Sequence, residues 1–147
     1  MSTSPQYNGK PVVELKQVYY AGTDEILPGY VLCYTHDADV DAADAKLSKG
    51  VQVSKPATAN LMLFAGIARS KVQGPGWLVI EEPKAGNCIK ALHKVNATKE
   101  VTALAPQNGE YALGAFTDAT LNLPLVGIAL ETSNTATTAA SKLFLVK

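Results

Sequence analysis

The chain has 147 residues, 47% of them hydrophobic and 18% charged, and its 13 basic side chains equal its 13 acidic ones. This length predicts one domain that buries about 70% of its unfolded surface and needs no metal or disulfide to fold. The zero net charge argues against nucleic acid as the main partner, because phosphate binding requires a basic surface. The sequence shows neither a signal peptide nor an apolar run near the ~20 residues of a membrane span, so we expect no membrane partner.

Residues 1–11 are polar and contain Pro5, Gly9 and Pro11, so we do not expect them to fold alone. They are predicted to form a flexible or extended N-terminal arm. Residues 12–147 are predicted to form a single β-rich domain.

The body is predicted to be mainly β, with little helix. Roughly eight to ten short apolar segments, punctuated by Gly and Pro, favour a small β-barrel or sandwich-like body. The run LMLFAGIA at 61–68 is continuously apolar, which indicates burial on both sides. The other predicted strands cover 12–20, 30–34, 51–54, 77–82, 87–95, 101–104, 123–131 and 143–146. A two-turn helix over 41–50 has only a thin apolar stripe, and the low-complexity stretch 132–141 is predicted to be a flexible loop.

The acidic stretch HDADVDAADA at 36–45 raises the question of a calcium site. Asp37, Asp39 and Asp41 match the first three ligand positions of an EF-hand loop. Ala42 stands where the loop needs a glycine, and Ser48 stands where it needs a chelating glutamate. We therefore favour a solvated acidic loop over a cation site, and predict no metal and no cofactor.

Catalytic motifs are not evident. His36 opens the acidic loop and His93 lies in an alternating segment, and neither has a recognisable catalytic context. Glu81 and Glu82 are neighbours in a predicted strand, so their carboxylates point to opposite faces. We expect no catalytic residues and no enzymatic activity. Cys33 and Cys88 each adjoin hydrophobic residues, and buried free thiols are the favoured interpretation, with a disulfide as the alternative.

Tyrosine is the main aromatic residue, with six copies against one tryptophan. It is favoured at protein interfaces because it buries a large area while its hydroxyl remains available to a partner. Tyr30 and Tyr34 are expected to be core strand residues. The candidates for inter-subunit or other intermolecular contact are Tyr7, Pro11, Tyr19 and Tyr20.

The segment from 28 to 87 carries a pattern of motifs. It comprises PGYVLCYTHD at 28–37, VQVSKPATANLMLFAGIA at 51–68 and GPGWLVIEEPKAGN at 74–87. In this order the segment resembles the capsid decoration, or cement, proteins of tailed bacteriophages. The matching residues are Gly29, Leu32, Tyr34, Val51, Val53, Pro56, Asn60, Phe64, Ala65, Gly66, Ala68, Glu82, Pro83 and Gly86.

The resemblance implies a structural virion protein, made in the host cytoplasm, on the outer surface of the assembled phage head. It implies that the protein binds the major capsid protein, bridges its subunits and stabilises the head, often as a homotrimer. The residues beyond Ala115 have no counterpart in the pattern. An alternative is a carbohydrate- or host-binding β-module of a virion fibre or cell surface, with calcium held by Asp37, Asp39 and Asp41.

Overall fold

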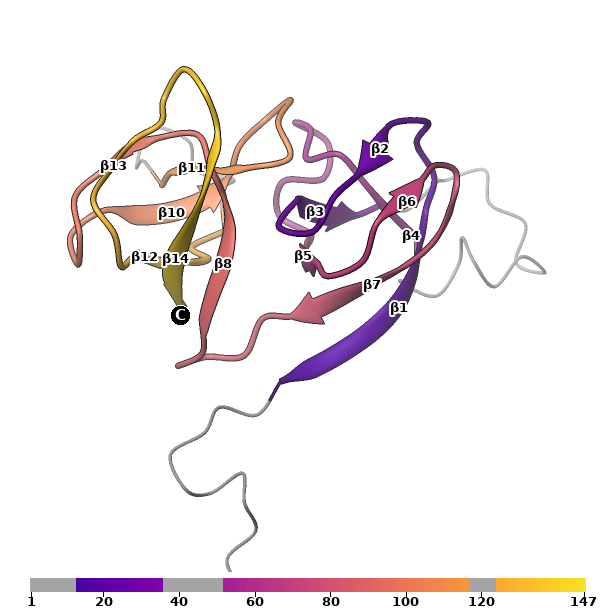
Figure 1. Cartoon of the computed structure of the whole chain (residues 1–147), viewed down its shortest axis with the longest axis horizontal. Helices are drawn as coiled ribbons and strands as arrows, with labels where there is room; N and C mark the ends of the chain where they lie inside the picture. Colours follow the sequence, from indigo (N-terminus) through magenta and orange to yellow (C-terminus); the bar gives the residue numbers. More distant parts are fainter. Residues whose placement is uncertain (1–12, 36–51, 117–123) are drawn as a thin grey trace, which may run out of the picture.

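The computed structural model describes residues 13–35, 52–116 and 124–147. Within these ranges every regular element is a strand, and no helix is long and apolar enough to cross a membrane. Two closed five-stranded barrels lie side by side and account for most of the chain (Figure 1). The predicted mainly β fold is thus confirmed. The chain forms two barrels, whereas we expected one β-rich body.

The N-terminal barrel has the strand order β1-β4-β3-β5-β7. β1 pairs with β7 along its whole length, from Glu14↔Glu82 to Tyr20↔Gly76, and it runs parallel to β4. A short sheet of β2 and β6 lies beside this barrel. The bounds are β1 (Glu14–Tyr20), β2 (Glu25–Ile26), β3 (Val31–Tyr34), β4 (Gln52–Ser54), β5 (Phe64–Ala68), β6 (Val72–Gln73) and β7 (Gly76–Glu82).

The C-terminal barrel has the strand order β10-β11-β8-β14-β12. Its longest pairing joins β14 to β8, from Ala140↔His93 to Leu145↔Cys88, and a short β9–β13 sheet lies beside it. The bounds are β8 (Cys88–His93), β9 (Asn96–Ala97), β10 (Ala103–Pro106), β11 (Leu113–Ala115), β12 (Gly127–Ala129), β13 (Ser133–Asn134) and β14 (Ala140–Val146).

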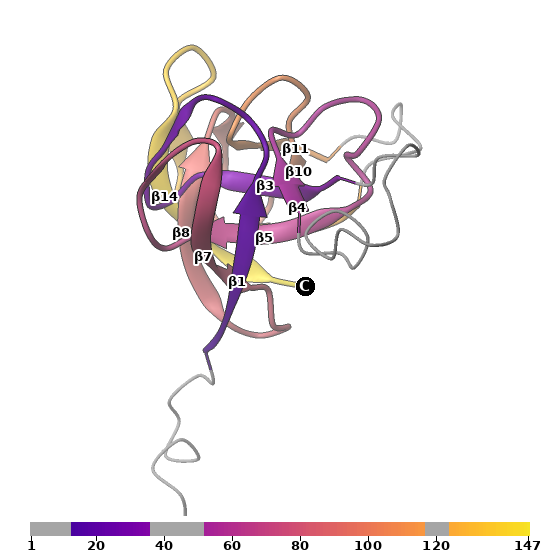
Figure 2. The same ribbon diagram turned by 90° about the vertical axis from the view of Figure 1, so that its right-hand side faces the viewer.

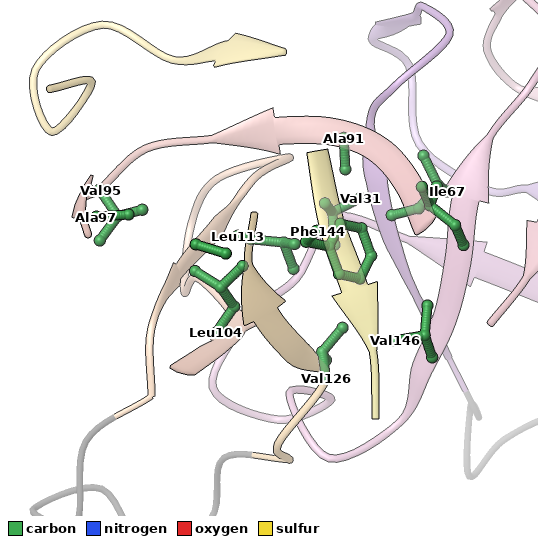
Figure 3. Close-up of a cluster of buried hydrophobic side chains, with 12 residues drawn as sticks. Val31, Ile67, Ala91, Val95, Ala97, Leu104, Leu113, Val126, Phe144 and Val146 are labelled. Atoms are coloured by element: carbon green, nitrogen blue, oxygen red, sulfur yellow. The ribbon is translucent and has the colours of Figure 1, made fainter. Parts of the chain in front are cut away.

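One apolar cluster joins the two barrels. Val31 and Ile67 belong to strands of the N-terminal barrel, yet they pack with Phe144 and Val146 of the C-terminal barrel (Figure 3). Val31 and Ile67 are both fully buried. Because alternate residues of a strand face opposite sides, Ile67 reaches this shared cluster while Ala68 packs into the N-terminal core. This arrangement explains the apolar residues of Phe64–Ala68, which is the part of the run 61–68 that forms a strand. Met62 and Leu63 are 57% and 39% exposed, so the expected burial on both sides is wrong for them.

Backbone hydrogen bonds also connect the barrels. The Val31 N–H donates to the Tyr111 carbonyl at 3.1 Å, and the Leu92 N–H donates to the Gly29 carbonyl at 2.9 Å. The Gly109 N–H donates to the Pro56 carbonyl at 2.8 Å. The prediction of a single domain over 12–147 stays a prediction. A single domain requires contacts between the two barrels, and these hydrogen bonds and the shared apolar cluster are such contacts.

The expectations for three local segments, 132–141, 1–11 and 41–50, have different outcomes. The predicted flexible loop at 132–141 is wrong, because this segment contains β13 and the start of β14. The Ser133 hydroxyl donates to the Val95 carbonyl at 3.0 Å, and the Thr135 hydroxyl donates to the His93 carbonyl at 2.8 Å. Both the arm over 1–11 and the helix over 41–50 lie outside the described residues.

Candidate interaction surface

The structure separates the predicted contact residues. Tyr19 and Tyr20 are neighbours in β1, so they point to opposite sides of the strand. Tyr20 lies in the N-terminal core with 1% of its surface exposed. This burial corrects our expectation that Tyr20 makes a surface contact. Tyr19 is half-buried on the outer side and contacts Trp77. Tyr7 and Pro11 lie outside the described residues.

Apolar side chains gather on the outer side of β1 and β7, which we call the β1–β7 face and define by Val13, Leu15, Tyr19 and Trp77. Leu15 is 61% exposed, Val13 49% and Trp77 46%. The rings of Tyr19 and Trp77 meet edge to face, with centroids 5.4 Å apart. The alternation predicts this face, since Val13, Leu15 and Tyr19 are odd-numbered while Val18 and Tyr20 are buried. Our sequence interpretation did not use this signal.

The edge of β1 opposite β7 is only partly paired. β1 meets β4 at Tyr19 and Tyr20 alone. Within 13–35, 52–116 and 124–147, no strand pairs with residues 14–18 on this side. Figure 2 looks onto β1, with β7 beside it.

A tyrosine cluster closes the other side of the N-terminal barrel. The Tyr111 hydroxyl donates to Asp24 Oδ2 at 2.7 Å, and the Tyr20 hydroxyl donates to the Tyr111 oxygen at 2.6 Å. Tyr111 also stacks on Tyr30, with centroids 5.2 Å apart. Burial, together with the bonds to Tyr20 and Asp24, raises the pKa of the Tyr111 phenol, so the hydroxyl stays protonated. Since Tyr111 follows β10, this cluster locks the second barrel onto the first.

Several residues of the decoration-protein pattern have structural roles. The Asn60 side chain accepts from the Ala57 N–H at 2.7 Å and donates to Ser54 Oγ at 3.0 Å, which fixes the loop after β4. A side chain at Gly66 would collide with the Glu81 carbonyl. Tyr34 packs partly buried against the N-terminal core and accepts a hydrogen bond from Lys16 Nζ at 2.9 Å. The pattern therefore reports the fold of the first barrel and not a binding surface.

The described residues contain no group of three or more His, Cys, Asp or Glu side chains that could hold a metal ion. His36 and the aspartates Asp37, Asp39 and Asp41 lie outside these residues. His93 is fully buried, and its Nδ1 lies 2.9 Å from the Ala91 carbonyl oxygen, to which it donates.

The two glutamates that end β7 differ, as the alternation predicts. The Glu81 side chain is 4% exposed and forms an ion pair with Arg69, whereas Glu82 is half-buried. The ion pair joins the end of β5 to β7 within the first barrel, and the two carboxylates do not form a pair.

The cysteines are both free thiols and have different environments. Cys33 is buried, and burial raises the pKa of its thiol to about 12. Cys88 is exposed, so the expectation of a buried thiol is right for Cys33 and wrong for Cys88. Cys88 begins β8, where its side chain faces outward while Ile89 fills the core.

Two clefts lie along the seam between the barrels. One of about 450 Å³ is lined by Leu61 of the first barrel and by residues of the second, including Lys94 and Gln107. Lys94 forms an ion pair with Glu110 at 2.5 Å at this cleft. The other, of about 550 Å³, is lined by Arg69, Cys88 and neighbouring residues.

No family model and no curated protein matches the sequence. Among solved structures, the chain is similar to the N base of the head fiber protein gp8.5 of bacteriophage phi29, with a TM-score of 0.61 and 9% sequence identity. The match covers 92% of this chain and 95% of that one. At this identity the match shows that the two chains share a fold, over both barrels.

Proposed function

We propose that this chain is a structural virion protein of a tailed bacteriophage, and that it binds the outer surface of the assembled head. The observation that carries this proposal is the shared fold, over nearly the whole of both chains, with the base of a phage head fiber. The decoration-protein pattern at 28–87 supports the same assignment from the sequence. The proposed role requires no catalytic chemistry and no cofactor.

The finer proposal is that the protein is a cement protein that bridges major capsid protein subunits. It would do so as a homotrimer, which is the oligomeric state that the resemblance implies. A single arm that becomes ordered on binding loses conformational entropy, so one copy binds weakly. Several linked copies that touch the shell together gain about 10²–10⁴-fold in avidity. If they bind only the assembled state of the head, they stabilise that state by linkage.

The first test asks whether the protein belongs to the virion. Mass spectrometry of purified particles should find it at tens to hundreds of copies per head, and electron cryomicroscopy should place its density outside the shell. Heads made without the gene should lose this density and regain it when purified protein is added. Absence of the protein from purified particles would overturn the proposal.

The second test concerns the arm. Deletion of residues 1–11 should reduce the number of copies bound to heads, while the circular dichroism of the free protein remains that of the full chain. A matched variant, Tyr7→Ala, measures the share of this loss that belongs to the predicted contact residue. Unchanged occupancy after the deletion would remove the arm from the binding surface while leaving the virion assignment intact.

The second candidate function is a carbohydrate- or host-binding module of a virion fibre. It is favoured by the fiber base that shares the fold, and by the pair of half-buried Tyr19 and exposed Trp77. Trp77→Ala should then reduce binding in a glycan array while leaving head binding unchanged. If calcium takes part through Asp37, Asp39 and Asp41, a chelator should lower the melting temperature of the free protein.

A further inference from the structure

We propose that Asn108 is a deamidation site, and that the contact between the two barrels holds its reaction back in the folded protein. Deamidation converts an asparagine to aspartate or isoaspartate without an enzyme. It is fastest where a glycine follows, because glycine has no side chain to obstruct the ring that forms. The chain has two such pairs, Asn8–Gly9 and Asn108–Gly109, and the structure describes the second. This modification does not rest on the proposed virion function.

The reaction uses the backbone nitrogen of Gly109 as its nucleophile. This nitrogen loses its proton to solvent and attacks Cγ of Asn108, and the new C–N bond closes a succinimide ring. The Cγ–Nδ2 bond then breaks, and the side-chain nitrogen takes up a proton and leaves as ammonia. Water opens the ring at either carbonyl. Opening at Cγ gives aspartate, and opening at the main-chain carbonyl gives isoaspartate.

In the folded chain this nitrogen is already hydrogen-bonded. The Gly109 N–H donates to the Pro56 carbonyl of the first barrel at 2.8 Å. While this bond is formed the nitrogen keeps its proton, and the partial negative charge of the Pro56 oxygen would repel the anion that must attack. Asn108 itself is exposed, so water reaches the residue freely. The reaction is therefore limited by the Gly109–Pro56 bond and not by access of solvent.

The bond belongs to a larger contact between the barrels. Gly109 has a φ of 79° and lies in a turn just before Tyr111, whose hydroxyl bonds to Tyr20 and Asp24 of the first barrel. Because these contacts adjoin one another, the Gly109 N–H leaves Pro56 only when the seam opens locally. The rate of deamidation in the folded protein thus reports how often this part of the seam opens.

Isoaspartate at 108 would weaken the same contact. The main chain of isoaspartate runs through the former side chain and is longer by one methylene before Gly109. The longer turn moves the Gly109 N–H away from the Pro56 carbonyl. It also adds a carboxylate close in sequence to Glu110, which already pairs with Lys94 at 2.5 Å. The first reaction therefore makes the seam open more easily.

Mass spectrometry of digested whole chain tests the protection, after incubation at mildly alkaline pH with or without enough urea to unfold it. In urea, Asn8 and Asn108 should deamidate at similar rates, because no folded contact remains at either residue. In the folded protein Asn108 should react at least about tenfold more slowly than it does in urea. Equal rates at Asn108 in the folded and the unfolded chain would overturn the proposal.

Hydrogen exchange at the Gly109 amide links the protection to its bond, because exchange and deamidation both require this N–H to leave Pro56. Ile67→Ala loosens the shared cluster of the two barrels and should speed both reactions several-fold by similar factors. The exposed control Val101→Ala should change neither rate. Ile67→Val is the milder variant, and circular dichroism shows which of them is folded. An unprotected Gly109 amide would overturn the proposal, and so would a folded Ile67 variant that leaves deamidation unchanged.

The effect of the product is measured on aged protein. Asn108→Gln retains the amide but closes the corresponding ring far more slowly, and it leaves Asn8 unchanged as a second site. The melting temperature of the natural chain should fall as isoaspartate at 108 accumulates, whereas that of Asn108→Gln, aged in parallel, should not. An equal change in the two proteins would overturn the weakening of the seam by isoaspartate.

Discussion

His93 makes the stability of the second barrel depend on pH. The ring is fully buried and its Nδ1 donates to the Ala91 carbonyl, while its Nε2 has no hydrogen-bond partner among the residues that the structure describes. Burial lowers the pKa of His93, outweighing the Ala91 carbonyl and Glu131, which raise it, and Lys142 also lowers it. A proton on Nε2 would thus place an unpaired charge beside Phe144.

The direction of the pH dependence follows from which state of the protein, folded or unfolded, takes up the proton at the higher pH. A histidine in the unfolded chain takes up a proton near pH 6.5, whereas buried His93 does so only at lower pH. Between these two values the unfolded state binds more protons, so the free energy of unfolding falls as the pH falls. From pH 7.5 to pH 5.5, a histidine that stays neutral when folded costs about 1.4 kcal/mol of stability.

Urea unfolding at both pH values measures this loss. His93→Leu removes the titrating group from the core and should abolish its share of the difference, which is at most about 1.4 kcal/mol. His36→Gln, at the other histidine of the chain, is the control variant. The comparison uses the change with pH, so the stability of the variant at pH 7.5 does not affect it. If His93→Leu retains the full pH dependence of the natural chain, the reasoning about its burial is wrong.

Three further outcomes follow from the described contacts. Tyr111→Phe retains the ring stack but removes the hydroxyl bonded to Tyr20 and Asp24, and should lower the unfolding free energy by about 1–3 kcal/mol. Ile67→Ala empties part of the shared cluster and should cost about 2–5 kcal/mol in urea unfolding, against about 0.5 kcal/mol or less for the exposed control Val101→Ala. A thiol reagent should modify Cys88 in the native protein, and Cys33 only after unfolding.

The sequence predicts the strands better than their arrangement. Apolar alternation and turn residues locate β1, β7 and β8 closely, because these signals are local, whereas only the last four residues of β14 were predicted as strand. Strand pairing is not local: β1 runs parallel to β4, which lies beyond a long intervening segment, and no single-strand pattern specifies that partner. The doubling of the barrel was missed for the same reason. A strand buried on both sides, as at Phe64–Ala68, is equally consistent with one sheet covered on both faces and with two barrels that share a core.

The candidate surface was predicted only in part. Tyr19 and Tyr20 were both proposed as contacts, although neighbours in a strand cannot face the same side. Applying that rule to 12–20 would have selected Tyr19 together with Val13 and Leu15. Trp77 is different, because only the pairing of β1 with β7 brings it to Tyr19. The contact between Tyr19 and Trp77 can therefore be predicted only when the strand pairing is known.

The residues shared with decoration proteins and the residues of the β1–β7 face do not overlap. Asn60 and Gly66 fix a loop and a close approach of strands within the first barrel. Val13, Leu15 and Trp77 stand outside the pattern, are exposed, and have no role in the core. Variants for binding studies should therefore be made along β1 and β7, where the exposed apolar side chains lie.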